Sequence, residues 1–181
     1  MKVCSKLIIF LLFYLNATSL LAFNKDSLIS ISNDTSNTVD DRFKALKKVT
    51  YFYLETNLDS ANKYADILNQ FAHNNNTSNY LQESLIIKGV VLQFLGEIIS
   101  AINKFREAEG INRIRKDVGI EIMLLNTYGN LYQETGNLDT ALIYYRLLLN
   151  KSLINKDSQY VSLAYNNLAG TYQMMSYNDS S

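Results

Sequence analysis

Apolar side chains return along most of the chain at steps of three and four residues, the spacing of one face of an α-helix. The clearest example lies in residues 125–148, where two such stripes follow each other. The first stripe ends near Tyr132 and the second begins at Leu138, with Gly136 between them. Glycine commonly ends a helix in the left-handed conformation. This stretch therefore predicts two helices joined by a tight turn.

Small side chains recur every forty residues at two positions of this pattern. One position lies in the first helix of each pair and the other in the second helix. A small side chain at such a position lets two helices approach closely. The predicted packing residues are Ala61, Gly89, Ala101, Gly129, Ala141 and Ala169.

The repeat and the polar breaks between its units predict seven helices. They span Val39–Glu55, Ser60–Ala72, Tyr80–Leu95, Ile98–Ile111, Val118–Thr135, Leu138–Leu153 and Gln159–Met175. Asp117, Asn137 and Ser158 are candidate N-caps, because their side chains can accept a hydrogen bond from the first turn of a helix. Asn79 with Gln82 is a candidate capping box. Met175 should be followed by a further turn, at the place that Gly136 holds one unit earlier.

Residues 125–148 resemble a tetratricopeptide repeat. The matching residues are Leu125, Gly129, Tyr132, Gly136, Ala141, Tyr145 and Leu148. Two departures are visible, since Leu125 stands where the family has Trp and the chain contains no Pro. The period of forty also exceeds the family's usual thirty-four residues. The resemblance implies an all-α, right-handed superhelical solenoid of antiparallel helix pairs, with about three and a half repeats over residues 39–181.

The resemblance also implies a peptide-binding groove lined by the first helix of each unit. The implied lining residues are Leu46, Thr50, Tyr53, Ile86, Val90, Gln93, Asn126, Asn130, Gln133, Asn166, Gly170 and Gln173. Amide side chains can hydrogen-bond the backbone of an extended peptide, or they can simply solvate an open surface. No Lys or Arg lies at these positions, which disfavours capture of a peptide's terminal carboxylate.

Residues 1–22 have the pattern of a secretory signal peptide. Lys2 and Lys6 precede an unbroken apolar run over residues 7–15. We expect cleavage after Ala22, with cleavage after Ser19 or an uncleaved anchor as alternatives. The predicted location is therefore the periplasm or the cell envelope.

The two ends of the repeat array differ in character. Residues 23–38 form a predicted polar leader, in which only residues 27–29 suggest a short helix. At the other end, an apolar stripe contains Tyr165, Leu168, Tyr172 and Met175. An uncapped repeat exposes its stacking face. Either this stripe is covered by residues beyond Ser181, in a longer protein, or it packs back onto the preceding helix.

Composition narrows the function classes. Lys+Arg and Asp+Glu both number 17, so the basic excess typical of nucleic-acid binding is lacking. Cys4 lies in the predicted signal peptide and His73 stands alone among Asn residues, so we predict no catalytic, metal or cofactor site. We expect a non-catalytic module that binds a protein or peptide.

The family resemblance and the N-terminal pattern favour the exported sensory or scaffold part of a larger bacterial signalling protein, with a possible membrane helix after the repeats. Two alternatives stay open. One is the N-terminal region of a longer enzyme, such as a sensor kinase or cyclase. The other is a free-standing periplasmic assembly factor.

Overall fold

A computed structural model describes residues 25–75 and 78–179 of the 181-residue chain. These residues form eight α-helices, and no strand occurs among them, so the all-α prediction is confirmed. The predicted signal peptide and the first two residues of the leader lie outside the described residues. None of the described helices combines the length and the apolar composition needed to cross a bilayer.

The predicted helix pattern matches the observed one closely from residue 39 onward. The helices are α2 (Lys25–Asn33), α3 (Val39–Thr56), α4 (Leu58–Asn74), α5 (Ser78–Phe94), α6 (Ile98–Arg115), α7 (Val118–Glu134), α8 (Leu138–Ile154) and α9 (Ser158–Asp179). Most predicted bounds fall within two residues of these. The exceptions are the ends of α6 and α9, each of which extends four residues further than predicted.

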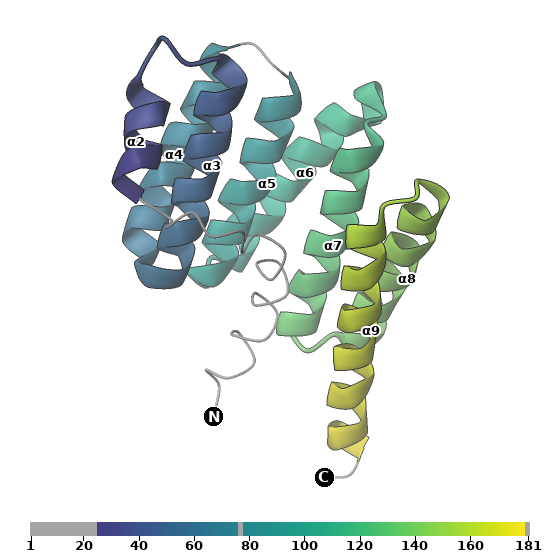
Figure 1. The fold of residues 1–181 in the computed structure, drawn as a ribbon. Coiled ribbons are helices and arrows are strands. Elements are labelled where there is room, and N and C mark those ends of the chain that lie inside the picture. The colour runs from purple at the N-terminus through teal and green to yellow at the C-terminus, as the bar shows by residue number, and fades with distance from the viewer. Residues whose placement is uncertain (1–24, 76–77, 180–181) are drawn as a thin grey trace. The chain divides into compact units, whose positions relative to one another are not determined.

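The chain divides into two compact units, with the boundary inside α7 between Leu124 and Leu125. In the unit that contains α2 to α6, each helix packs on the next one along the chain. In the other unit, α8 packs on α9. Consecutive helices within each unit run in opposite directions (Figure 1), as short connections between packed helices require.

The core of the first unit forms where α3, α4 and α5 meet. Its buried cluster consists of Phe43, Leu46, Leu68, Ala72 and Ile87. The Tyr80 ring stacks on Phe43, with 4.3 Å between the ring centroids. Burial of this apolar surface supplies the main driving force for packing the three helices together.

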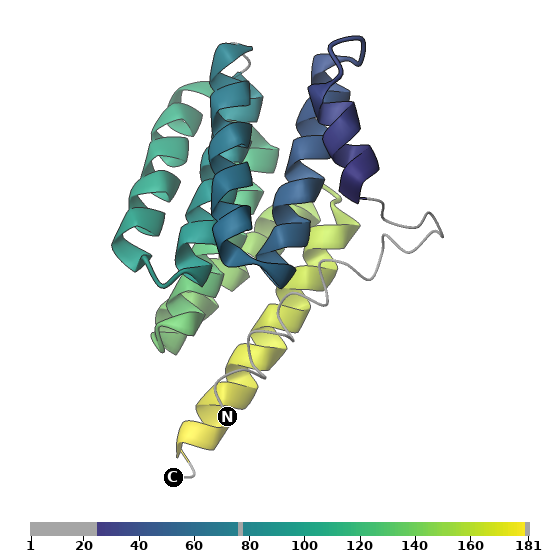
Figure 2. The same ribbon diagram turned by 90° about the vertical axis from the view of Figure 1, so that its left-hand side faces the viewer.

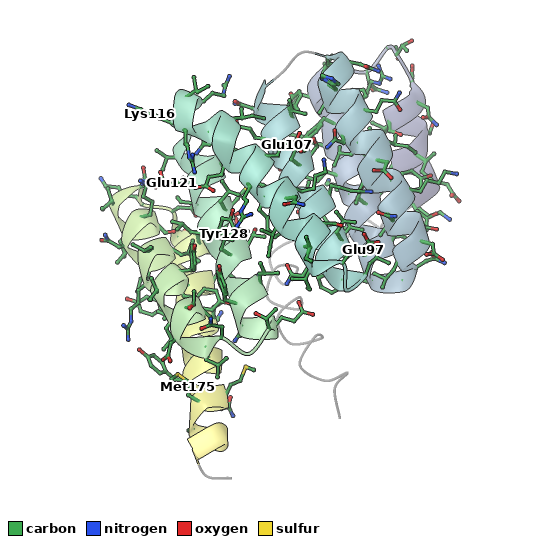
Figure 3. All side chains as sticks on the ribbon, turned by 180° about the vertical axis from the view of Figure 1, so that it is seen from behind. Glu97, Glu107, Lys116, Glu121, Tyr128 and Met175 are labelled. Atoms are coloured by element: carbon green, nitrogen blue, oxygen red, sulfur yellow. The ribbon has the colours of Figure 1, made fainter. Side chains whose placement is uncertain are left out.

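The forty-residue period is visible in the backbone at the helix ends. Gly96 follows α5 and Gly136 follows α7, and their φ angles are 82° and 81°. Lys116 and Lys156 follow α6 and α8, with φ angles of 56° and 57°; Lys116 is labelled in Figure 3. A left-handed residue ends a helix by turning the next N–H groups back onto its last carbonyls.

The N-cap predictions hold at Asp117 and Asn137 but not at Ser158 or Asn79, and Asn79 lies inside α5. Asp117 and Asn137 each accept a hydrogen bond from the backbone N–H three residues later, at 3.1 and 3.3 Å. Ser158 was predicted to cap α9, but the capping side chain is that of Asp157, which accepts the equivalent bond at 3.1 Å. A carboxylate there also interacts favourably with the helix dipole.

Residues 25–33 of the predicted leader form α2, which is longer than the short helix suggested at residues 27–29, and they pack on α3. Ser32 is buried in that contact. Leu28 and Ser32 stand forty residues before Leu68 and Ala72, which are fully buried in α4. Residues of α2 therefore hold the positions of the last half of a second helix, and the forty-residue pattern begins before residue 39.

The turn predicted after Met175 is absent, because α9 stays helical to Asp179. Ser176 stands forty residues after Gly136, and serine lacks the freedom of glycine to adopt the left-handed conformation. In Figures 1 and 2 the last turns of α9, drawn in yellow, extend beyond the end of α8.

Candidate functional site

The repeat alanines of the second helices are fully buried. Ala61, Ala101 and Ala141 expose none of their surface, and each is the fourth residue of its helix. A larger side chain at such a position would push the helix away from its neighbour. These positions hold the helix pairs together and leave no side chain available to a ligand.

The repeat glycines of the first helices lie against aromatic rings. A side-chain carbon added to Gly89 would lie 2.2 Å from an atom of the Phe105 ring on α6. The same addition at Gly129 would lie 2.4 Å from the Tyr145 ring on α8. Real side-chain carbons do not approach this closely, so each ring occupies the space that the missing side chain leaves.

In the first pair of helices, α3 and α4, the larger side chain stands on the first helix and the smaller one on the second. This is the reverse of the two later pairs. Val49 on α3 stands forty residues before Gly89, and Ala65 on α4 stands forty residues before Phe105. Both side chains are fully buried. A valine on the first helix thus goes with an alanine on the second, and the summed volume of the two side chains stays small enough to avoid overpacking.

Ala169, the last of the predicted packing residues, is exposed. No helix follows α9 among the described residues. Tyr165 and Tyr172 flank Ala169 on α9 and are 56 % and 47 % exposed. The two tyrosines are thus about half exposed, although the Tyr172 hydroxyl contacts Arg146 of the preceding helix. We refer to Tyr165, Ala169 and Tyr172 as the open face of α9.

The same face is covered on the equivalent helix of the first unit. Leu85 and Leu92 on α5 stand eighty residues before Tyr165 and Tyr172, and they are 1 % and 7 % exposed. Gly89, between them, is buried under the Phe105 ring of α6. The open face of α9 thus has the residue pattern of a helix–helix contact while its surface faces solvent.

The composition of α9 also differs from that of an ordinary solvated helix. Its 22 residues include a single charged residue, Asp179, at the very end. Tyrosines and methionines are frequent in it, and Met175 on its last turns is labelled in Figure 3. Depletion of charge together with enrichment in Tyr and Met is typical of the core of a protein–protein interface.

Arg146 on α8 borders the open face. Its guanidinium donates a hydrogen bond of 2.6 Å to the Tyr172 hydroxyl. This bond fixes the ring of Tyr172 and places a positive charge at the edge of an otherwise uncharged surface. A partner that covered the face could keep this charge in water at the rim, where its desolvation costs little.

The amides predicted to line a peptide groove on α7 instead form hydrogen bonds within the second unit. The Tyr145 hydroxyl lies 2.8 Å from Asn130 Oδ1 and 3.0 Å from Gln133 Oε1. Gln133 Nε2 in turn donates to Thr171 Oγ1 on α9 at 3.1 Å. Burial raises the pKa of the Tyr145 hydroxyl above its ordinary value, so this group remains a protonated donor.

A second amide pair joins α7 to α9. Asn167 Nδ2 donates to Asn126 Oδ1 at 3.0 Å, and both residues are buried. The Thr171 hydroxyl donates to the backbone carbonyl of Asn167 at 2.7 Å. Because buried polar groups are costly to leave unpaired, these amides stabilise the packing of α7 and α9 and are already occupied.

The structure places the predicted groove residues in three environments. Buried are Leu46, Thr50, Ile86, Gln93, Asn126 and Gln133; half-buried are Tyr53, Val90, Asn130 and Gly170; exposed are Asn166 and Gln173. The exposed pair lies on α9, beside the open face. Among the predicted groove residues, the exposed ones are thus those of α9, whose nearly uncharged composition sets this helix apart in the sequence.

Ionic groups of the first unit pair between helices. Lys88 on α5 contacts Asp66 at 2.6 Å and Asn62 at 2.7 Å, both on α4. Lys47 on α3 contacts Glu83 on α5 at 2.7 Å.

Within residues 25–75 and 78–179, no three His, Cys, Asp or Glu side chains are grouped in a way that could hold a metal ion. No protein-family model matches the chain, and no curated protein matches it either.

Proposed function

We propose that this chain is a non-catalytic protein-interaction module built as a right-handed, tetratricopeptide-like solenoid of antiparallel helix pairs. Three recurrences at forty residues support the solenoid. They are the left-handed glycines after α5 and α7, the fully buried alanines of α4, α6 and α8, and the contacts between glycine and aromatic ring. A repeat of this kind buries its hydrophobic face by stacking on its neighbours.

The open face of α9 is the observation that carries the interaction function. Tyr165 and Tyr172 are large, amphipathic and about half exposed, and no charge lies on their helix before Asp179. Such a surface binds a protein partner without desolvating ionic groups. In this proposal the module belongs to the exported sensory or scaffold part of a larger signalling protein, as the N-terminal pattern suggests.

Photo-crosslinking in the cells that make the protein tests this function. A photoreactive amino acid at position 165 or 172 should give a discrete protein adduct. The same amino acid at Lys63, an exposed position on α4, should not. Equal crosslinking at all three positions, or none at any, would contradict the proposed interaction surface. Fractionation of the same cells tests export, since a cytoplasmic pool alone would remove the envelope part of the proposal.

A further inference from the structure

The outer side of α8 carries a stripe of exposed aliphatic side chains. Ile143, Leu147 and Ile154 are 56 %, 49 % and 69 % exposed, and the exposed Asn150 lies between them on the same side of the helix. We refer to these four residues as the outer stripe of α8. We propose that the outer stripe binds the outer stripe of a second copy of this chain, so that two α8 helices pair antiparallel about a two-fold axis. This surface is separate from the open face of α9.

The outer stripe differs from the same places on the other second helices of the repeat. The residues there are Lys63, Ile67, Gln70 and Asn74 on α4, and Asn103, Glu107, Gly110 and Ile114 on α6. Glu107 is labelled in Figure 3. Each of those helices has one large apolar residue at these places, whereas α8 has three. Single exposed apolar residues are ordinary on a protein surface, but a contiguous group of them marks an interaction site.

Helix α4 shows that these places stay open when further helices follow. In the first unit, α5 packs on α4 and α6 packs on α5. All four α4 residues at these places nevertheless remain exposed, and Ile67 has 38 % of its surface in contact with solvent. Helices stacked after α9 in the same manner would therefore leave the outer stripe of α8 uncovered. The cover of this stripe is thus not a further repeat.

The outer stripe is complementary to itself in the reversed direction. The midpoint between Ile143 and Ile154 along α8 is also the midpoint between Leu147 and Asn150. When two copies pair antiparallel about this midpoint, Ile143 of each copy lies opposite Ile154 of the other, and Leu147 lies opposite Asn150. Every contact then occurs twice, which is the condition for a two-fold interface between identical chains.

Charges at the two ends of α8 favour the antiparallel direction. Asp139 stands four residues before Ile143 and Lys156 stands two residues after Ile154, and both charged residues are exposed. Antiparallel pairing brings Asp139 of each copy near Lys156 of the other, whereas parallel pairing would bring like charges together. This separation of charge also disfavours an anionic membrane as the occupant, because helices that bind such surfaces are rich in cations along their polar face.

The cations beside the stripe are compatible with this pairing. Arg146 and Lys151 are five residues apart, which places them on opposite edges of the stripe. A two-fold axis brings each edge beside the same edge of the second copy, so Arg146 of one copy does not face Lys151 of the other. The hydrogen bond from Arg146 to the Tyr172 hydroxyl holds the guanidinium against α9 of its own chain.

The length of the stripe determines the expected strength of the dimer. From Ile143 to Ile154 the helix rises by roughly 17 Å. A single helix pair of this length buries less than the roughly 1,200 Å² at the lower limit of standard interfaces, and such small interfaces are typical of transient association. We therefore expect a reversible dimer with a Kd of roughly 10–100 µM.

Sedimentation equilibrium of the full chain tests the dimer, over total concentrations of roughly 1–300 µM that bracket this Kd. Ile143→Lys installs the residue type that α4 has at the same place, Lys63. It should raise the Kd at least about tenfold, because it buries a charge in the contact. Asn103→Lys makes the same change at the equivalent place on α6 and should leave the Kd unchanged. Both positions are exposed, so both variants should melt within about 2 °C of the parent chain.

Exchange of the charges tests the direction of pairing. Asp139→Lys alone and Lys156→Glu alone each place like charges at both ends of the dimer. Each should therefore raise the Kd at least about threefold at low salt. An equal mixture of the two variants restores opposite charges at both ends, so mixed dimers should form with nearly the Kd of the parent chain. High salt should remove these differences, because it screens exposed charges.

Three results would overturn the inference. They are a monomer at every concentration, a dimer that survives Ile143→Lys, and charge variants that associate no better when mixed than alone. Flotation with phosphatidylglycerol vesicles tests the other class of occupant. If vesicles capture a monomeric chain and Ile143→Lys prevents this capture, the stripe belongs to a membrane surface instead. Crosslinking from positions 165 and 172 decides the function proposed above separately, since those positions lie outside the outer stripe.

Discussion

At each contact between paired helices α5–α6 and α7–α8, a residue on one helix is complementary in size to a residue on the other. Phe105 is matched by Gly89, and Tyr145 by Gly129. The hydroxyl that distinguishes Tyr145 from Phe105 has its own match, because Asn130 accepts a hydrogen bond from it and Val90 stands at that position one unit earlier. Size and polarity are thus balanced within each contact, as dense packing of an interior requires.

Gly129→Ala should lower the free energy of unfolding by roughly 1–3 kcal/mol, because the added carbon meets the Tyr145 ring and overpacks the contact. Gly170→Ala on α9 is the matched control. Its added carbon has Gln133 Nε2, at 3.9 Å, as its nearest neighbour. Alanine there should raise stability by roughly 0.5–1 kcal/mol, as expected inside a helix. Urea unfolding followed by circular dichroism measures both, and equal effects would argue against a close crossing at Gly129.

Tyr145→Phe should destabilise the protein by roughly 1–3 kcal/mol, because Asn130 Oδ1 and Gln133 Oε1 lose their donor. Adding Asn130→Val gives positions 130 and 145 the residue types that stand at positions 90 and 105, one unit earlier. The double variant should recover part of the loss. Urea unfolding of the two single variants and the double variant gives the coupling. If the effects of the single variants simply add, the hydrogen bond carries no stability.

At the scale of elements, the ends of helices α5 to α8 repeat at forty residues, as their buried faces do. The helices α5 and α7 end in left-handed glycines, Gly96 and Gly136, whereas α6 and α8 end in left-handed lysines, Lys116 and Lys156. The first helix of the earliest pair, α3, ends instead at Asn57 with an extended backbone. A side chain in that conformation costs roughly 1–2 kcal/mol. The lysines tolerate this strain because the chain must turn sharply there to begin the next helix.

Lys156→Gly should therefore raise the melting temperature, since glycine adopts the same backbone conformation without strain. The gain in stability should be about 1 kcal/mol at most, because glycine also loses more entropy on folding. Gly136→Ala places a side chain in the same conformation and should lower stability by roughly 1–2 kcal/mol. Thermal unfolding of both variants tests the assignment, which fails if the two changes have the same sign.

Most helix bounds could be predicted to within two residues because the sequence features that determine them are local. Apolar spacing, the capping side chains of Asp117 and Asn137, and the glycine turns all act within about four residues. The short helix α2 was predicted only at residues 27–29, because its apolar residues are few and its packing on α3 stabilises it. Arg42 Nε on α3 donates to the Ser32 carbonyl at 2.9 Å, a bond across ten residues.

At the scale of the molecule, α2 closes one side of the first unit by packing on α3. A chain that begins at Ser36 lacks α2, whereas one that begins at Phe23 retains it. The shorter chain should melt at least about 3 °C lower, because the side of α3 that α2 covers becomes exposed and Arg42 loses its acceptor. Differential scanning calorimetry compares the two, and equal melting temperatures would show that α2 adds nothing to the core.

Local spacing along the sequence was enough to determine the helices, the forty-residue repeat and the small residues at the crossings. The tertiary structure decided which of the equivalent positions are covered. Leu85 and Tyr165 share one place in the repeat, yet one is buried and the other is exposed. Burial depends on whether another helix lies over the position, and local spacing does not encode that. The same reason explains the amides of α7: the hydrogen-bond partner of Asn126 is Asn167, far along the chain and adjacent only after folding.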